Sequence, residues 1–296
     1  MDGGVARLMS FLTVHHTTVY RYAQPVRLGE HRMMFRPRES HDLRLLRTDL
    51  QIWPRPANLR WLHDPFDNSV AVATFEGTTS ELRFESTVTL EHFENTVPEY
   101  PLEEYARSYP FRYSDEDFPS LMRALAPHYP DGAVSQWALR FLAPSETTGT
   151  MQMLRAMTRG IREEFEYTRR DQKGVQTPDE TLRTHRGSCR DFAVLMMEAS
   201  RSLGVATRFV SGYIYTPSAS GMAGGGATHA WMQAYLPGAG WIDFDPTNSI
   251  IGNRNLIRVA VAWTPEQVLP LWGTYSGAKG SFLGMDVDVS VTEAAL

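Results

Sequence analysis

The 296-residue chain is predicted to be an α+β protein with two domains, and three observations support this prediction. Residues 11–95 alternate between apolar and polar side chains and are rich in Val, Thr and Tyr, as antiparallel strands are. Helical patterns occupy residues 117–203, and strand-like segments return after Gly204. We therefore expect a β-rich N-terminal domain at 11–95. A second domain is expected at 96–296, with helices packed on an antiparallel sheet and a core at 145–250.

The N-terminal domain is expected to form a small sandwich or an open barrel. Turn-forming clusters at 53–58 and 64–68 separate its strands, and Gln24 and Pro25 are expected to end the first strand. The strands are expected at residues 12–22, 43–53, 69–75 and 81–91.

Residues 96–115 contain three prolines and are interpreted as a linker. The helix that begins at Cys189 is expected to end before Gly204. Earlier helices are expected where apolar residues recur at helical spacing, at 117–125, 131–142, 146–167 and from Thr177 onward. The later strands are expected at 205–215, 229–236, 241–245, 257–262 and 285–291.

Composition limits the classes of partner. The net charge is −5 and the Lys and Arg residues are dispersed, so no nucleic acid is expected as a partner. No apolar run approaches the ~20 residues that a membrane span needs, so no membrane partner is expected. The only cysteine, Cys189, excludes an intrachain disulfide and fits a reducing compartment, which predicts a cytoplasmic protein.

Cys189 lies in a turn that leads into a helix. Gly187 permits the turn, and Ser188 with Asp191 forms a capping-box-like pair that puts Cys189 at the first helical position. There the unpaired N–H groups and the helix dipole favour a thiolate over a thiol. A lone cysteine is more often a small buried apolar residue. The polar neighbours Ser188, Arg190 and Asp191 favour a cleft over a core.

Two further residues complete a candidate catalytic site. His229 begins a strand directly after a glycine-rich segment, where it is placed to act as a base, although most histidines in the chain are interpreted as surface or capped residues. Asp245 ends the next strand, and an Asp-Pro pair more often only forms a turn. A short hairpin joins the two strands, so the side chains of His229 and Asp245 can meet. Asp243 shares a face with Asp245 and is the rival carboxylate.

The length of the hairpin loop decides whether His229 and Asp245 share a face. A four-residue loop at 237–240 would set Asp245 opposite Met232 and point it away from His229. A three-residue loop or a bulge would set Asp245 opposite Trp231, on the face of His229. We expect the second arrangement.

The three side chains together suit acyl transfer from an amide. A cysteine attacks a carbonyl as the thiolate, which an imidazole creates and holds as an ion pair. The same imidazole protonates the leaving amine, and a carboxylate on its far nitrogen fixes the tautomer. The backbone N–H of Cys189 is placed to stabilise the oxyanion. No metal or other cofactor is needed, and no Cys/His cluster has zinc-ligand spacing.

Four motifs, which lie in order at residues 187–193, 208–213, 229–231 and 245–248, together resemble those of the bacterial transglutaminase-like superfamily. The resemblance implies a papain-like α+β core with a Cys-His-Asp triad, in which Cys189 is the nucleophile, His229 the base and Asp245 the orienting carboxylate. Asp243 ranks second because it lies outside the matching motif. At 16–22, 36–38 and 64–68 the N-terminal half resembles the β-rich domain that often precedes this core.

The sequence alone does not decide the roles of several residues. The family more usually has glycine where Asp67 stands, but aspartate tolerates the left-handed backbone conformation. Tyr167 falls where the family places an aromatic residue near the site, and it is equally well read as a core aromatic at a helix end. Trp231 either lines an acyl groove or only packs. The glycine-rich segment 218–227 is expected to be mobile and to border the cleft.

The expected function is thiol-dependent acyl transfer on a peptide or side-chain amide, through a Cys189 thioester. Water as the acceptor would make the protein a protease or deamidase, and an amine would make it a transglutaminase. The substrate is expected to be a protein or peptide. The alternative is a catalytically inactive protein-binding module that uses the β domain.

Overall fold

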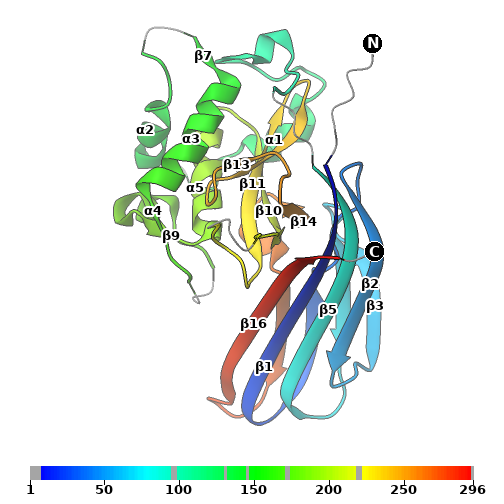
Figure 1. The fold of residues 1–296 in the computed structure, drawn as a ribbon. Coiled ribbons are helices and arrows are strands. Elements are labelled where there is room, and N and C mark those ends of the chain that lie inside the picture. The colour runs from blue at the N-terminus through cyan, green and yellow to red at the C-terminus, as the bar shows by residue number, and fades with distance from the viewer. Residues whose placement is uncertain are drawn as a thin grey trace.

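The structure is a computed structural model that describes residues 8–94, 99–129, 132–144, 147–170, 174–217 and 222–294. The α+β class is confirmed. Helices lie beside one antiparallel sheet in the upper part of Figure 1, and a second, curled antiparallel sheet extends below them. Within the described ranges, no helix is long and apolar enough to cross a membrane.

The N-terminal sheet is organised around one long strand, β1. β1 pairs with β5 between Leu8 and Val26 and with β4 at His31–Met33, which gives the order β2-β5-β1-β4-β3. Alternate side chains point into the curl and form an apolar cluster that includes Met33, Leu82 and Phe84. The strands are β1 (Leu8–Met33), β2 (Leu43–Trp53), β3 (Asn58–His63), β4 (Ser69–Thr74) and β5 (Thr79–Glu94).

The predicted end of the first strand is wrong. Gln24 and Pro25 do not end β1, which continues to Met33. Instead, the pairing between β1 and β5 shifts register between Arg21 and Val26. A register shift of this kind accommodates a proline, because the proline has no N–H to donate to the ladder.

Strand β3 lies between the two predicted turn clusters and was not expected from the sequence. Five of its six residues are exposed, so it lacks the half-buried alternation that identifies a strand. The turn that follows β3 keeps its shape with aspartate, because Asp67 adopts a left-handed φ of 62°.

The chain returns to the N-terminal sheet at its C-terminal end. β15 (Leu271–Ser276) and β16 (Phe282–Glu293) both pair antiparallel with β1. The strand predicted at 285–291 is therefore confirmed as part of β16, but it extends the sheet that opens the chain. The division into 11–95 and 96–296 stays a prediction, and the observed sheet takes strands from both ranges.

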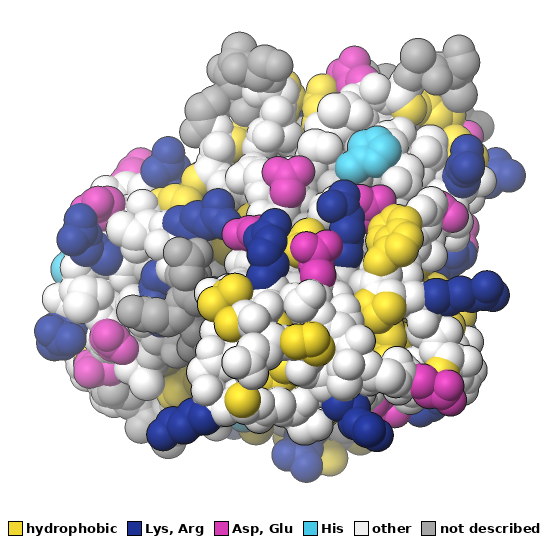
Figure 2. Space-filling view, turned by 90° about the horizontal axis from the view of Figure 1, so that it is seen from below, with side chains coloured by type: hydrophobic (Ala, Val, Ile, Leu, Met, Phe, Trp, Pro, Cys, Tyr) yellow, Lys and Arg dark blue, Asp and Glu magenta, His cyan; other side chains and the backbone are white. Residues whose placement is uncertain are grey.

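The face seen from below carries charges of both signs. Figure 2 shows Lys and Arg interspersed with Asp and Glu there, between separate apolar patches. The N-terminal sheet also exposes large apolar side chains at Trp53, Trp61, Trp272, Phe282 and Leu283.

The helices follow the predicted order, with shorter ends. They are α1 (Phe118–Leu125), α2 (Gly132–Leu139), α3 (Thr150–Glu164), α4 (Pro178–Thr184) and α5 (Cys189–Ser202). The predicted linker contains the short helix η1 (Glu104–Ala106) and strand β6 (Ser108–Tyr109), which pairs with β7 (Thr148–Gly149). A second short helix, η2 (Pro265–Val268), precedes β15.

Helix α5 lies at the centre of the helical part of the fold. It packs on β11 and β10 of a five-stranded sheet, and α2, α3 and α4 contact it from other sides. Its residues Phe192, Leu195 and Met196 are buried, and burying such side chains contributes about 1.5–3 kcal/mol each. The sheet has the order β13-β12-β11-β10-β14. Its strands are β10 (Thr207–Ile214), β11 (His229–Leu236), β12 (Gly240–Asp245), β13 (Ile250–Ile251) and β14 (Leu256–Ala262).

The N-terminal sheet and the five-stranded sheet share one continuous core. Leu12 and Leu90 of the first belong to the same apolar cluster as Phe244 of the second. Polar contacts also join them: the Asn68 side chain donates to the Val261 carbonyl and accepts from the Val261 N–H, both at 2.9 Å. The N-terminal sheet is thus fixed against β14.

Candidate active site

Cys189 begins helix α5, as predicted. The Ser188 N–H donates to Asp191 Oδ2 at 2.8 Å, which is one half of the expected capping box, and Ser188 Oγ donates to the same oxygen at 2.8 Å. Asp191 is buried, and Arg170 Nη1 donates to its two carboxylate oxygens at 2.8 and 2.9 Å. The start of the helix is therefore firmly held, with Cys189 only 6% exposed.

Tyr167 lies beside the turn that precedes Cys189. Strands β8 (Glu166–Tyr167) and β9 (Arg186–Gly187) pair in parallel, with Tyr167 opposite Gly187. Burial, and then the proximity of Cys189, raise the pKa of Tyr167 to about 12. Tyr167 therefore lies beside the turn that precedes Cys189 and also packs against the apolar core, so both interpretations of this residue hold.

His229 and Asp245 meet inside the protein. His229 begins β11 and is 1% exposed, and Asp245 ends β12 and is fully buried. Their side chains form a hydrogen bond, with His229 Nε2 2.9 Å from Asp245 Oδ2. Asp245 also accepts from the Thr247 N–H at 2.9 Å and from Asn248 Nδ2 at 2.8 Å. Both carboxylate oxygens of Asp245 therefore accept hydrogen bonds.

The predicted register is confirmed. Leu236 pairs with Gly240, so the hairpin loop has three residues, 237–239. The same pairing sets Gln233 opposite Asp243 and Met232 opposite Phe244. Because side chains alternate along a strand, Asp245 lies on the face of His229.

The charges of this pair support each other. Burial alone would lower the pKa of His229, but Asp245 and then Cys189 outweigh burial and raise it to about 10. Burial alone would raise the pKa of Asp245, but His229, Asn248 and the Thr247 N–H hold it below its usual value. Both shifts favour an imidazolium–carboxylate pair at neutral pH.

The second ring nitrogen of His229 is left for the cysteine. Nδ1 is buried and has no hydrogen-bond partner among the described residues. Cys189 is close enough to raise the pKa of the ring, but the thiol and Nδ1 do not meet the geometry of a hydrogen bond. Gly224, with φ of 96°, lies against the same nitrogen, because a Cβ built there would be 2.5 Å from Nδ1. The imidazole thus has the Asp245 carboxylate on its Nε2 side. Cys189 and Gly224 lie on its Nδ1 side.

Asn248 ties the glycine-rich segment to the site. Its Oδ1 accepts from the Ala223 N–H at 2.8 Å, and its Nδ2 donates to the Ala223 carbonyl at 3.1 Å. Ala223 and Gly224 of the segment therefore border the site, whereas residues 218–221 lie outside the described residues. The mobility of the segment stays a prediction.

Asp243, the rival carboxylate, has other partners. Its Oδ1 accepts from Trp231 Nε1 at 2.7 Å and from Gln233 Nε2 at 2.8 Å, and its Oδ2 accepts from Arg258 Nη1 at 3.0 Å. Trp231 is fully buried, with its ring stacked on that of His229 at 5.8 Å between centroids and 28° between planes. Trp231 therefore packs behind the histidine and does not line a groove.

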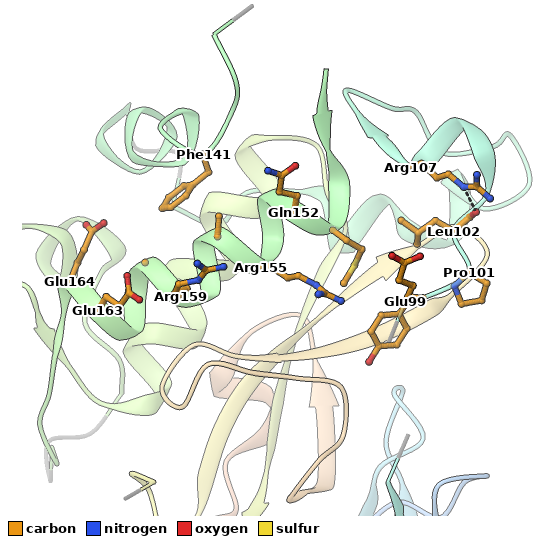
Figure 3. Close-up of a pocket in the computed structure, with 14 residues that line it drawn as sticks. Glu99, Pro101, Leu102, Arg107, Phe141, Gln152, Arg155, Arg159, Glu163 and Glu164 are labelled. Carbon is orange, nitrogen blue, oxygen red and sulfur yellow. Dashed lines mark hydrogen bonds between the residues drawn. The ribbon is translucent and has the colours of Figure 1, made fainter. Parts of the chain in front are cut away.

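A groove lies away from the three candidate catalytic residues. It has a volume of about 1040 Å³ and runs along α3 and the segment 99–107, with Gln152, Arg155 and Arg159 of α3 lining it (Figure 3). Its lining residues do not include Cys189, His229 or Asp245, which are at most 6% exposed. The candidate site is therefore separate from this groove.

Sequence reasoning missed the roles of Asn248 and Arg258. Asn248 stands in the motif at 245–248, so its position next to Asp245 was the available signal. Arg258 lies on β14, and no local pattern links it to Asp243. Across the described residues, no group of three His, Cys, Asp or Glu side chains is arranged to hold a metal ion.

Comparison with known proteins identifies the family. Residues 12–91 match the bacterial transglutaminase-like N-terminal region, and residues 136–246 match the transglutaminase-like superfamily. The chain belongs to the transglutaminase-like superfamily and carries the bacterial N-terminal region of that family.

Two curated relatives match part of the chain. An uncharacterized protein of Mycobacterium leprae (strain TN) is 39% identical over 119 residues, which are 39% of this chain and 41% of that protein. One from Mycobacterium tuberculosis (strain H37Rv) is 30% identical over 165 residues, 53% of this chain and 52% of that protein. The chain thus spans about half or less of these curated relatives.

A solved structure shares the whole architecture. The crystal structure of a candidate cysteine protease from Cytophaga hutchinsonii superposes with a TM-score of 0.71 at 17% identity, covering 98% of this chain and 93% of that chain. The predicted fold, an N-terminal β region followed by a transglutaminase-like, papain-like core, is confirmed.

Proposed function

We propose that the chain is a thiol-dependent acyl-transfer enzyme that acts on a peptide or side-chain amide through a thioester on Cys189. The observation that carries the proposal is the buried His229–Asp245 hydrogen bond, which leaves Nδ1 of His229 unpaired beside Cys189. Membership of the transglutaminase-like superfamily supports a thiol-dependent enzyme in general.

The proposed first half-reaction forms the thioester. The Cys189 thiolate adds to the amide carbonyl carbon, and the carbonyl electron pair moves to oxygen. The backbone N–H of Cys189 and the positive end of the α5 dipole stabilise that oxyanion. The imidazolium Nδ1–H of His229 protonates the leaving nitrogen as the C–N bond breaks, which leaves a neutral imidazole. Asp245 holds Nε2–H, so Nδ1 is the nitrogen that exchanges protons.

The second half-reaction decides the name of the activity. The neutral imidazole of His229 takes a proton from water or from an amine as that acceptor attacks the thioester, and Cys189 leaves as thiolate. Hydrolysis makes the protein a protease or deamidase, and transfer to an amine makes it a transamidating enzyme. Hydrolysis of a cytoplasmic protein or peptide is the form we propose first, because water is always present as acceptor.

Ammonia and amine release from protein and glutamine-containing peptide substrates tests the proposal. We expect release by the wild type, loss of release in Cys189→Ala and His229→Gln, and unchanged release in His63→Gln, a control at an exposed histidine. A primary amine added in excess separates the two acceptors, because incorporation of the amine indicates transamidation. Release that persists undiminished in Cys189→Ala would contradict the proposal.

A further inference from the structure

A chain of polar contacts leads from the N-terminal sheet to the back of the candidate histidine. Asp42, next to the first residue of β2, is 5% exposed, and Arg258 Nη2 donates to its carboxylate oxygens at 2.7 and 2.9 Å. Through Nη1 the same guanidinium donates to Asp243 at 3.0 Å. Arg258 therefore bridges a carboxylate of the N-terminal sheet and a carboxylate of the five-stranded sheet.

The chain continues to the imidazole through Trp231. Asp243 accepts the indole N–H of Trp231 at 2.7 Å, and the indole ring stacks on His229. Gly224 lies against Nδ1 of the imidazole. The orientation of the indole therefore helps to set the plane of the imidazole, and Asp243 sets the orientation of the indole.

Stability alone does not explain these buried charges. Removing two carboxylates and a guanidinium from water has a large desolvation cost, and apolar residues of similar size often stabilise a fold as well or better. Buried ionic groups are retained in some proteins because they fix one arrangement among several. Burial raises the pKa of Asp42, but Arg258 outweighs burial and holds it at about 2, so the bridge is ionised at neutral pH.

We infer that Asp42, Arg258 and Asp243 are positioning residues, through which the N-terminal sheet holds Trp231 and thereby His229 in the orientation that serves Cys189. This inference rests on the proposed function and gives the N-terminal region a part in it. The docking of that region thereby supports the site through Trp231.

The experiment compares variants of the full chain that break this bridge with one that weakens the same interface elsewhere. Asp42→Asn removes a negative charge. Arg258→Lys keeps the positive charge but loses the guanidinium whose two terminal nitrogens bind Asp42 and Asp243. Asn68→Ala is the matched control, because among the described residues the side-chain hydrogen bonds of Asn68 go to Val261, Arg38 and Asp64, and not to a residue of the bridge. Thermal midpoints measure the loss of stability in each.

Two readouts are needed. The first is the rate at which iodoacetamide alkylates Cys189, the only cysteine, at pH 7 and at a temperature where all variants are folded. We expect Asp42→Asn and Arg258→Lys to slow it about 3- to 30-fold, and Asn68→Ala to leave it unchanged. The second is the indole N–H resonance of Trp231, assigned with Trp231→Phe, which is expected to shift in the two bridge variants only.

The outcomes separate this inference from the proposed function. Equal alkylation rates and an unmoved indole resonance in Asp42→Asn and Asn68→Ala would overturn the positioning role. A wild-type Cys189 that reacts no faster than an unfolded cysteine would overturn the proposed function, and the indole resonance would still decide whether the bridge orients Trp231.

Discussion

Replacing Asp245 by asparagine removes the charge that holds His229 protonated while keeping the shape of the side chain. Asp245 accepts three hydrogen bonds, from His229, Asn248 and the Thr247 N–H. An asparagine has one oxygen and an NH₂ group, so at least one of these donors loses its acceptor. With the charge gone, burial dominates and lowers the pKa of His229. The thiolate then loses its imidazolium partner.

The size of the effect follows from the chemistry of a free thiol. A cysteine without a cationic partner has a pKa of about 8.5, so only about 3% is thiolate at pH 7. If the wild-type site holds a thiolate–imidazolium pair, Asp245→Asn slows alkylation about 30-fold at pH 7 and about 300-fold at pH 6. Turnover falls about 10²- to 10⁴-fold, because proton transfer is also lost. The unpaired donor lowers stability by about 1–3 kcal/mol.

The assay is the pH dependence of the iodoacetamide reaction, followed by intact mass. Only one cysteine is present, so the mass gain reports Cys189 alone. Asp115→Asn removes a charge at an exposed loop position and is the control. Superimposable profiles for the wild type and Asp245→Asn would refute the reasoning, since Asp245 would then have no influence on the sulfur.

Three further predictions concern the same region. In Gly224→Ala a Cβ would fall 2.5 Å from Nδ1 of His229 at a left-handed φ, so urea denaturation should show a loss of about 1–3 kcal/mol, together with altered alkylation. Leu195→Ala, at a fully buried position of α5, should cost about 2–5 kcal/mol, whereas Leu139→Ala at an exposed one should cost much less; equal losses would contradict the packing described. The raised pKa of His229 means that its imidazolium stabilises the fold fully below pH 6.5, and that this contribution fades as pH rises toward about 10. Melting curves of the wild type should therefore converge on those of His229→Gln across that range, and a constant difference would argue against the shift.

Local features of the site could be predicted from the sequence. The turn and cap that start α5 involve only residues 187–191, so neighbouring residue types were sufficient to place Cys189. The hairpin between β11 and β12 could be predicted because side-chain parity follows from loop length. Asp67 could be predicted to accept its left-handed turn for the same local reason.

Long-range contacts could not be predicted in this way. β16 pairs with β1, and no pattern within 282–293 indicates a partner at the other end of the chain. The role of Asp243 depends on Arg258, on another strand 15 residues away, and beyond it on Asp42, which lies 216 residues before Arg258. From the sequence, Trp231 could equally well line a groove or pack in the core. The alternation of side chains along a strand shows which face Trp231 is on, but not what covers that face. Burial in three dimensions decided the matter.

The central claim is that Cys189 forms a covalent acyl intermediate with the help of His229. The most direct measurement is the intact mass of the full chain after brief exposure to a peptide thioester or activated amide donor at pH 7, followed by an acid quench. The account predicts an acyl adduct on Cys189 that hydroxylamine removes, that is absent from Cys189→Ala and that forms far more slowly in His229→Gln. An adduct that forms equally fast without the imidazole, or none in the wild type with any donor, would contradict it.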